Sequence, residues 1–355
     1  MKIRLLKSII PLFIFLFISI NTDAQYSNKK IKSKHQAYTD SLKSIDYDRI
    51  LPILGRGAYK QGFDIPYPIG VMANFIWMTQ GISIDNLQLG LKTDNNDIPL
   101  TDVDFIEFGD NQNTSFSTNF RPDIWILPFL NVYGLFGVGR TKTEVELIAP
   151  VSMVSVVEQG LSTTGFGLLG AGGVGPVWIS VDANFTWNKP ELLEEATQVN
   201  VVGLRIGHSF VFKNKPYRNI NLWVGAMRVH MNSKTSGAIT LYDALPQETW
   251  DQKDQIVAEY EQWKVDNYND LTIKQKLTVD NVIDPIVDGI DNLDGDAIIS
   301  YSMDKQTKEL WNGIIGAQFQ FNKAWQLRSE VGFIGDRKSV LVSLNYRILG
   351  PKRKM

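Results

Sequence analysis

The stretch that decides the fold is Trp311–Phe321, WNGIIGAQFQF, followed by Trp325–Phe333, WQLRSEVGF, and Ser339–Ile348, SVLVSLNYRI. Apolar and polar residues largely alternate in each segment, as in a β-strand that has one face in an apolar environment. Short polar runs, Asn322-Lys323-Ala324 and Gly335-Asp336-Arg337-Lys338, separate the segments and predict tight hairpins. Three segments in phase therefore indicate consecutive antiparallel strands.

The same alternation extends upstream through most of the chain. Counting the long segment Ile69–Lys92 as one strand gives ten strands; splitting it and admitting Val103–Gly109 gives twelve, within an expected range of eight to twelve. A slip of phase near Gly81 predicts a β-bulge. The other predicted upstream strands are Ser115–Ile126, Leu130–Val138, Thr163–Gly172, Val177–Trp187, Val202–Phe212 and Asn219–Met231.

The N-terminus predicts export. Met1–Ala24 has a short basic start, an apolar core that is too short to span a bilayer, and a small residue before the expected cleavage point. An exported chain of alternating strands is best explained by an all-β fold, a single transmembrane antiparallel up-and-down β-barrel of the outer membrane. Closure satisfies every backbone polar group inside lipid.

Composition argues against several classes of partner and of functional site. The formal net charge is −2, without a basic face, which argues against nucleic acid. The absence of cysteine excludes disulfide scaffolds, thiol nucleophiles and a lipoprotein anchor. We expect no cofactor and no metal site, because the acidic run Asp288–Asp296 lacks the glutamate that closes a calcium loop.

The predicted organisation has four parts: signal peptide 1–24, a periplasmic N-terminal segment 25–68, the barrel 69–349, and a basic C-terminal tail 350–355. The polar, Lys-rich stretch Asn28–Ser44 predicts a flexible lead-in to the barrel. Up-and-down topology makes the connections between alternate strands short periplasmic turns. The longer connections then become extracellular loops, namely Lys142–Ser162, Asn188–Val199 and Lys234–Glu309.

The insertion 234–309 departs from the strand pattern. Apolar residues at helical spacing predict helices over Gln252–Val265 and Ile273–Ile290, and Pro285 should kink or end the second one. Three roles are open for this two-helix extracellular insertion. It covers apolar side chains of the loop, it binds a partner or ligand, or it folds into the lumen.

Alternation also predicts which charged residues point into the lumen. Such charges either pair into a salt-bridge plug, as in Arg328–Glu330 and Arg121–Asp123, or form the constriction of a narrow pore. A pore would select anions because arginine outnumbers acidic residues there. The candidates are Arg121, Asp123, Asp182, Arg205, Arg328, Glu330 and Arg347.

The pair His208-Ser209 is the one arrangement that suggests hydrolytic chemistry. Adjacent residues of a strand point to opposite faces, so these two side chains cannot act together as base and nucleophile. By phase, His208 faces outward. We therefore predict no enzymatic activity.

The runs Arg121–Gly134, Trp325–Ile334 and Ser343–Arg347 resemble those of poorly characterised Gram-negative outer-membrane β-barrel proteins. The resemblance covers most of Ile69–Leu349 outside the insertion and implies a fold and a location, without catalytic residues. It implies contact with outer-membrane lipid, lipopolysaccharide and the outer-membrane insertion machinery. Such barrels usually end on an aromatic residue, whereas Gly350–Met355 follows the last strand here.

Three functions follow from the sequence, in order of preference. The first is a small-solute channel or transporter with a charged, narrow lumen. The second is a non-conducting structural or surface-binding barrel, in which 234–309 contacts an extracellular ligand or protein. The third is a membrane-embedded hydrolase.

Overall fold

A computed structural model describes residues 34–92, 97–212, 214–231 and 234–353. The predicted signal peptide 1–24, together with residues 25–33, lies outside this described part. Two helices, α2 (Lys34–Lys43) and α3 (Gly55–Lys60), precede the first strand. None of the described helices is long and apolar enough to cross a membrane.

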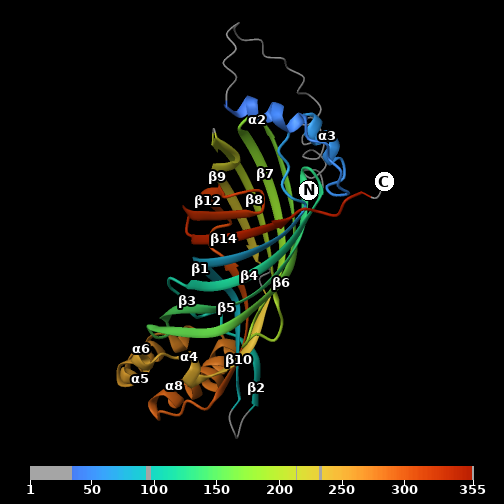
Figure 1. Cartoon of the computed structure of the whole chain (residues 1–355). Helices are drawn as coiled ribbons and strands as arrows, with labels where there is room; N and C mark the ends of the chain where they lie inside the picture. The colour runs from blue at the N-terminus through green and yellow to red at the C-terminus, as the bar shows by residue number, and fades with distance from the viewer. Residues whose placement is uncertain (1–33, 93–96, 213, 232–233, 354–355) are drawn as a thin grey trace, which may run out of the picture. The chain divides into compact units, whose positions relative to one another are not determined.

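Ten antiparallel strands close into a barrel, which confirms the predicted fold (Figure 1). Closure occurs at β1, whose residues from Ile69 to Thr79 pair with β14 on one side and with β4 on the other. The strands of the wall are β1 (Ile69–Lys92), β4 (Gln112–Leu127), β5 (Leu130–Ala149), β6 (Met153–Val174), β7 (Val177–Pro190), β8 (Thr197–Phe212), β9 (Lys215–Met231), β12 (Trp311–Gln320), β13 (Trp325–Ile334) and β14 (Lys338–Ile348).

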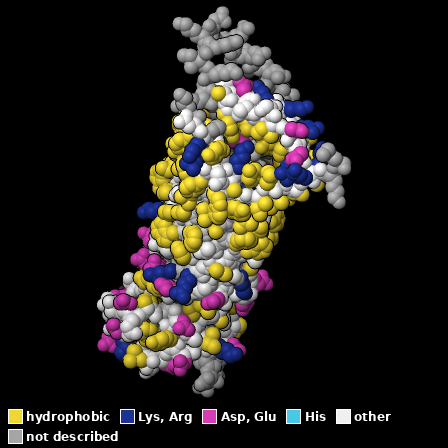
Figure 2. All heavy atoms as spheres, viewed as in Figure 1, with side chains coloured by type: hydrophobic (Ala, Val, Ile, Leu, Met, Phe, Trp, Pro, Cys, Tyr) yellow, Lys and Arg dark blue, Asp and Glu magenta, His cyan; other side chains and the backbone are white. Residues whose placement is uncertain are grey.

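The outer face of the wall carries the apolar half of the alternation. Phe75, Phe120 and Ile206 are 50%, 50% and 52% exposed, although large apolar side chains normally avoid water. On the face seen in Figure 2, apolar side chains form a band across the middle of the barrel, with charged side chains gathered toward both ends. We call this band the belt. It is the surface that a membrane-spanning barrel presents to lipid.

Beyond Gly81, β1 leaves the barrel and enters a second, smaller sheet. There it pairs with β11 (Ile298–Thr307) and β2 (Asp97–Asp102), and β11 pairs with β10 (Lys234–Thr240). The predicted phase slip is therefore a change of partners at Gly81. The bulge itself lies between Asp85 and Gln88, where Asn86 has a φ of 52°.

The bounds of two predicted extracellular loops are wrong, because the strands run well past the belt. β5 and β6 continue as a paired hairpin from 139 to 161, so 142–162 is not an irregular loop. The sequence there, with its Thr and Val residues, has high β-propensity. Likewise β7 ends at Pro190 and β8 begins at Thr197, which leaves a loop of 191–196. The two-residue strand β3 (Glu107–Phe108) pairs with the far end of β5.

The insertion forms a helical subdomain at the loop end, defined as the end of the barrel with the long connections. Both predicted helices are present, one as α6 and the other as the continuous run α7–η2–α8. Pro285 does not interrupt this run, since it stands in the first turn of α8, directly after the π-helical η2. The helices are α4 (Leu241–Ala244), α5 (Gln247–Asp251), α6 (Lys253–Asn267), η1 (Tyr268–Asp270), α7 (Ile273–Thr278), η2 (Val279–Ile283) and α8 (Asp284–Asp291).

The helical subdomain has a hydrophobic core of its own. Tyr260, Val279 and Ile290 are 1%, 0% and 1% exposed, and they pack with Val103 and Val151 from the strand connections. An apolar cluster of this kind stabilises the subdomain as a folded unit.

The opposite end of the barrel, which carries the short strand connections and is called the turn end, holds α2 and α3. Residues 34–43 are helical rather than a flexible lead-in, because Tyr38 and Leu42 pack with Tyr59 and Ile65 in a small apolar cluster. Asp64 accepts a hydrogen bond from the Tyr38 hydroxyl at 2.7 Å. The lead-in prediction is corrected for these residues.

Candidate functional site

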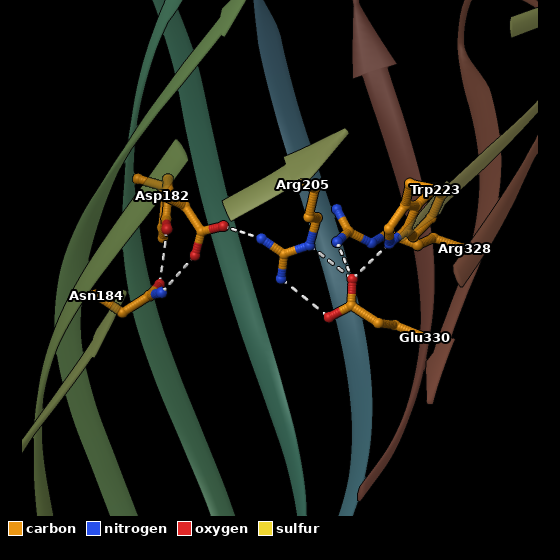
Figure 3. A network of polar contacts seen from close by, with 7 residues as sticks. Asp182, Asn184, Arg205, Trp223, Arg328 and Glu330 are labelled. Atoms are coloured by element: carbon orange, nitrogen blue, oxygen red, sulfur yellow. Dashed lines mark hydrogen bonds and ion pairs between the residues drawn. The ribbon is translucent and has the colours of Figure 1, made fainter. Parts of the chain in front are cut away.

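The lumen contains a network of ion pairs centred on Glu330 of β13 (Figure 3). Arg205 Nε and Nη2 donate to its two carboxylate oxygens at 2.7 and 2.9 Å. Arg328 Nη2 and Trp223 Nε1 also donate to Oε2, at 2.9 and 2.8 Å. Arg205 pairs in addition with Asp182. Hence Arg205 lies between two carboxylates, and Glu330 receives hydrogen bonds from three side chains.

This network crosses the interior of the barrel. Arg205 is on β8 and Glu330 is on β13, and β9 and β12 stand between these strands in the wall. Both residues are buried, at 8% and 7% exposure. A buried carboxylate and guanidinium are stable only when paired, so the two side chains hold separate parts of the wall together.

A second cluster lies on the β14–β1–β4 side of the lumen. Arg347 Nη2 donates to Asp123 Oδ1 at 2.7 Å, and Asn131 Nδ2 donates to the same oxygen at 2.7 Å. β1 separates the strands of Arg347 and Asp123, and Gly70 of β1 lies beneath their contact. A Cβ at Gly70 would lie 2.5 Å from Asp123 Oδ2. The missing side chain at Gly70 therefore allows this pair to form across β1.

Arg121 and Tyr133 connect the two clusters, since Arg121 Nη2 donates to Asn131 Oδ1 of the second cluster at 3.4 Å. The guanidinium carbon of Arg121 lies 3.5 Å from the centroid of the Tyr133 ring, a cation–π contact. The Tyr133 hydroxyl donates to Asn184 Oδ1 at 2.7 Å, and Asn184 Nδ2 donates to Asp182 at 3.0 Å. The structure thus brings all seven predicted charged residues into one connected set of contacts.

The predicted partners are only partly correct. Arg328 and Glu330 do pair, but along one strand rather than across strands. In the part of the chain that the structure describes, Arg121 forms no ion pair with a carboxylate. Asp123 pairs with Arg347 instead. Residues two apart on a strand share a face, but Asp123 points toward Gly70, where Arg347 reaches it, while Arg121 stacks on Tyr133.

Sequence reasoning missed several side chains that fill the lumen. Ile314, Val229 and Leu135 are 2%, 5% and 8% exposed, so the inner face is not uniformly polar. Trp223 and Tyr133 are also buried there, at 5% and 3%. Strand alternation is the pattern that identifies such residues. Trp223, for example, lies two residues after Asn221 and four after Asn219, so it shares the inward face with them.

Arg337 is another residue that the sequence did not reveal. It lies in a predicted hairpin turn, yet it is 1% exposed, and its Nε donates to Gln80 Oε1 at 2.7 Å. Nothing in the local sequence distinguishes it from a solvated turn residue. Its position becomes clear only from the pairing of β1 with β14.

Lys305 points inward at the loop end, outside the belt. Its Nζ donates to Thr143 Oγ1 at 3.3 Å, and burial lowers the pKa of the ammonium to about 8. β11 carries this residue opposite Ile84 of β1, in the smaller sheet. A charge in this position is costly because the surroundings disfavour the protonated form.

A crevice of about 330 Å³ opens between β2 and the helical subdomain. At its edge, Lys274 pairs with Asp102 of β2. The hydrogen bond from Lys274 keeps the pKa of the Asp102 carboxyl below its usual range. Apolar and polar side chains both line it: Asp97, Ile98, Pro99, Thr101, Lys274, Leu277, Thr278, Asn281 and Val282.

His208 and Ser209 do not approach one another as a catalytic pair would. Ser209 Oγ donates to Asn221 Oδ1 at 2.5 Å inside the lumen. The His208 ring lies 4.4 Å from that of Phe210, which is on the outer face. In the part of the chain that the structure describes, no group of three metal-ligating side chains comes together.

Comparison with known proteins finds distant structural similarity. No known family matches the sequence, and no curated protein does. The beta domain of the Bordetella autotransporter Brka overlaps with 79% of this chain and all of its own, at 7% identity and a TM-score of 0.37. The outer membrane protein OprG from Pseudomonas aeruginosa overlaps with 80% of this chain and all of its own, at 8% identity and a TM-score of 0.36. The toluene transporter TbuX from Ralstonia pickettii overlaps with 79% of this chain and 90% of its own, at 9% identity and a TM-score of 0.26. The fold assignment itself rests on the strand pairing.

Proposed function

We propose that this chain is an integral outer-membrane barrel with a closed lumen, and that it acts at the cell surface as a binding protein through its helical subdomain. The belt supports the membrane location, since a closed wall with an apolar exterior suits lipid. Barrels of this kind keep their short turns in the periplasm, so the turn end faces inward and the helical subdomain faces the medium.

The main observation in favour of a closed lumen is the Arg205–Glu330 pair. Conduction requires a continuous path for water and ions, whereas this pair and its neighbours span the interior. Buried apolar side chains, among them Ile314 and Leu135, fill further space. Small barrels are commonly filled by their own side chains in this way. The geometry therefore favours the non-conducting hypothesis over the channel that sequence alone ranked first.

The helical subdomain supports the binding role. Ile273 and Leu277 of α7 are 82% and 57% exposed, and Leu100 of β2 is 42% exposed. The crevice that Leu277 lines adds a concave feature beside these side chains. Exposed apolar side chains that border a concave feature are typical of a surface that contacts another molecule.

The test replaces Leu241–Ala297 with Asn-Gly. Thr240 and Ile298 are directly paired, so a two-residue hairpin closes the gap between β10 and β11. Proteoliposomes of each form are probed with a glycan array and with a displayed peptide library, while swelling in a pentose sugar measures permeability. We expect ligands selected by the full chain to be lost in the deletion, with background swelling in both.

Leu277→Asp is the matched point variant, and Gln306→Asp, at an exposed position of β11, is its control. Only the first should weaken binding. Rapid swelling of liposomes that contain the full chain would contradict the closed lumen. Equal binding by the full chain and the deletion would contradict the role of the helical subdomain.

A small-solute channel is the second candidate, favoured by the charge of the lumen. Four arginines, Arg121, Arg205, Arg328 and Arg347, face three acidic side chains, Asp123, Asp182 and Glu330. An open form would therefore prefer anions. The test measures the reversal potential in a salt gradient. An open pore of this charge should shift the reversal potential toward the equilibrium potential of the anion. We propose no enzymatic activity.

A further inference from the structure

Residues Asp48–Leu54, which we call the rim segment, complete the barrel wall at the turn end. β1 begins only at Ile69, opposite Ile348 of β14 and Ile124 of β4. Past those residues, β4 continues to Leu127 and the chain continues beyond the end of β14 as residues 349–353, without β1 between them. The rim segment takes its place. Ile50 N donates to Pro351 O at 3.1 Å, and Ile53 N donates to Ile126 O at 2.8 Å.

The C-terminal tail takes part in the same arrangement. Arg49 forms an antiparallel bridge with Lys352, and its guanidinium donates to Gly350 O at 2.9 Å. Arg353 N donates to Asp48 O at 2.8 Å. The rim segment is therefore held by backbone hydrogen bonds to β4 on one side and to the residues that follow β14 on the other, as a strand of the wall would be.

The rim segment exposes large apolar side chains beside the belt. Ile50, Ile53 and Leu54 are 46%, 50% and 65% exposed. The neighbouring belt residues Ile348 and Leu349 are 46% and 42% exposed. The hydrogen bonds of the rim segment place it directly next to these residues, so the apolar surface continues from the belt onto the rim.

Basic side chains accompany this apolar surface. Asp46 and Asp48 pair with three of them, which leaves an excess of positive charge at the rim. Cationic side chains at the edge of an apolar surface suit the phosphate groups of phospholipids. The basic residues are Arg49, Arg56, Lys352 and Arg353.

We propose that the rim segment lies in the membrane, with Ile50, Ile53 and Leu54 in the acyl region of the adjacent leaflet and the basic side chains at the phospholipid headgroups. The chain is thus embedded through its rim as well as through its strands. This inference goes beyond the proposed binding function and requires only that the belt lies in lipid, which the experiment checks separately.

The experiment uses the absence of native cysteine. A nitroxide is attached to Ile53→Cys, to Leu54→Cys, to Asp46→Cys as an aqueous control, and to Val342→Cys as a belt reference. Each full-length variant is reconstituted in phosphatidylethanolamine–phosphatidylglycerol vesicles. Collision rates with oxygen, which concentrates in lipid, and with a water-soluble nickel chelate are then measured.

We expect the oxygen-to-nickel ratio at positions 53 and 54 to exceed that at 46 at least threefold and to approach that at 342. A ratio at both positions equal to that at 46, with an oxygen-dominated label at 342, would overturn the proposal and place the rim in water. Low collision rates with both reagents would also overturn it, since they would indicate protein contact. A nickel-dominated label at 342 would instead contradict the membrane-embedded barrel.

Discussion

Arg205 and Glu330 are 125 residues apart in sequence and form a bidentate ion pair inside the barrel. Arg205 Nε and Nη2 lie 2.7 and 2.9 Å from the two carboxylate oxygens of Glu330. Their strands are not neighbours in the wall, so the pair joins separate parts of the cylinder. Trp223 and Arg328 reinforce it through Glu330 Oε2. The interior of the barrel is organised around this carboxylate.

Glu330→Ala should strongly destabilise the barrel. The change leaves Arg328 without its carboxylate and Arg205 with Asp182 alone, and breaking a buried pair in this manner costs about 3–5 kcal/mol. Urea unfolding of the protein in vesicles measures the free energy of unfolding. The control, Asp102→Asn, removes an exposed partner of Lys274 and should leave stability unchanged. Equal effects of the two variants would show that Glu330 does not organise the interior.

Gly70→Ala should weaken the Arg347–Asp123 pair. The added methyl would lie 2.5 Å from Asp123 Oδ2 and 2.7 Å from Arg347 Nη1, so one of the two side chains must move. Such overpacking costs about 1–3 kcal/mol. Gly57→Ala in α3 is the matched control, because its Cβ would meet nothing within 4 Å. A Gly70→Ala barrel as stable as the control would mean that the glycine is not required for the pair.

Lys305 makes stability depend on pH at the alkaline end. Its folded pKa is about 8 and its ordinary value is 10.5, so the unfolded chain binds more protons between these values. The free energy of unfolding should therefore rise as the pH increases from about 8 to 10.5, by at most about 3 kcal/mol. Lys305→Met should be more stable than the parent at pH 7 and should lose this rise. Parallel pH profiles of the two proteins would contradict the assignment.

Trp223→Phe tests the third donor to Glu330. The variant keeps the ring in the lumen but removes the Nε1 donor, which lies 2.8 Å from Oε2. A hydrogen bond to a charged group contributes about 1.5–3 kcal/mol. Unfolding in urea should show a loss of this size in the parent and a much smaller one in a Glu330→Ala background. Additive losses would indicate that the indole acts independently of Glu330.

The sequence predicted the ten-stranded barrel and the inward position of the charged residues, because side chains alternate strictly along a strand. It predicted the Arg328–Glu330 pair, but not the other ion pairs of the lumen. The Arg347–Asp123 contact depends on a glycine of the intervening strand, 53 residues before Asp123 in sequence. Pairings across a closed sheet depend on strand order and register, which local alternation does not contain.

Strand ends were also hard to predict for a physical reason. Outside lipid, the hairpin of β5 and β6 has no apolar face to maintain, so its alternation weakens while its backbone pairing continues from 139 to 161. The helices at 253–267 and 273–291 were predictable because their apolar residues recur at helical spacing and form the core of the helical subdomain.

Single-channel recording of the full chain in planar bilayers tests the closed lumen most directly. With insertion verified by the lipid-dependent signal of a label at Val342→Cys, the barrel should show no stable current steps. Truncating both sides of the central pair, Arg205→Ala with Glu330→Ala, should remove the side chains that cross the interior and produce transient openings. Steady, uniform current steps from the unmodified chain would contradict a lumen closed by the Arg205–Glu330 pair.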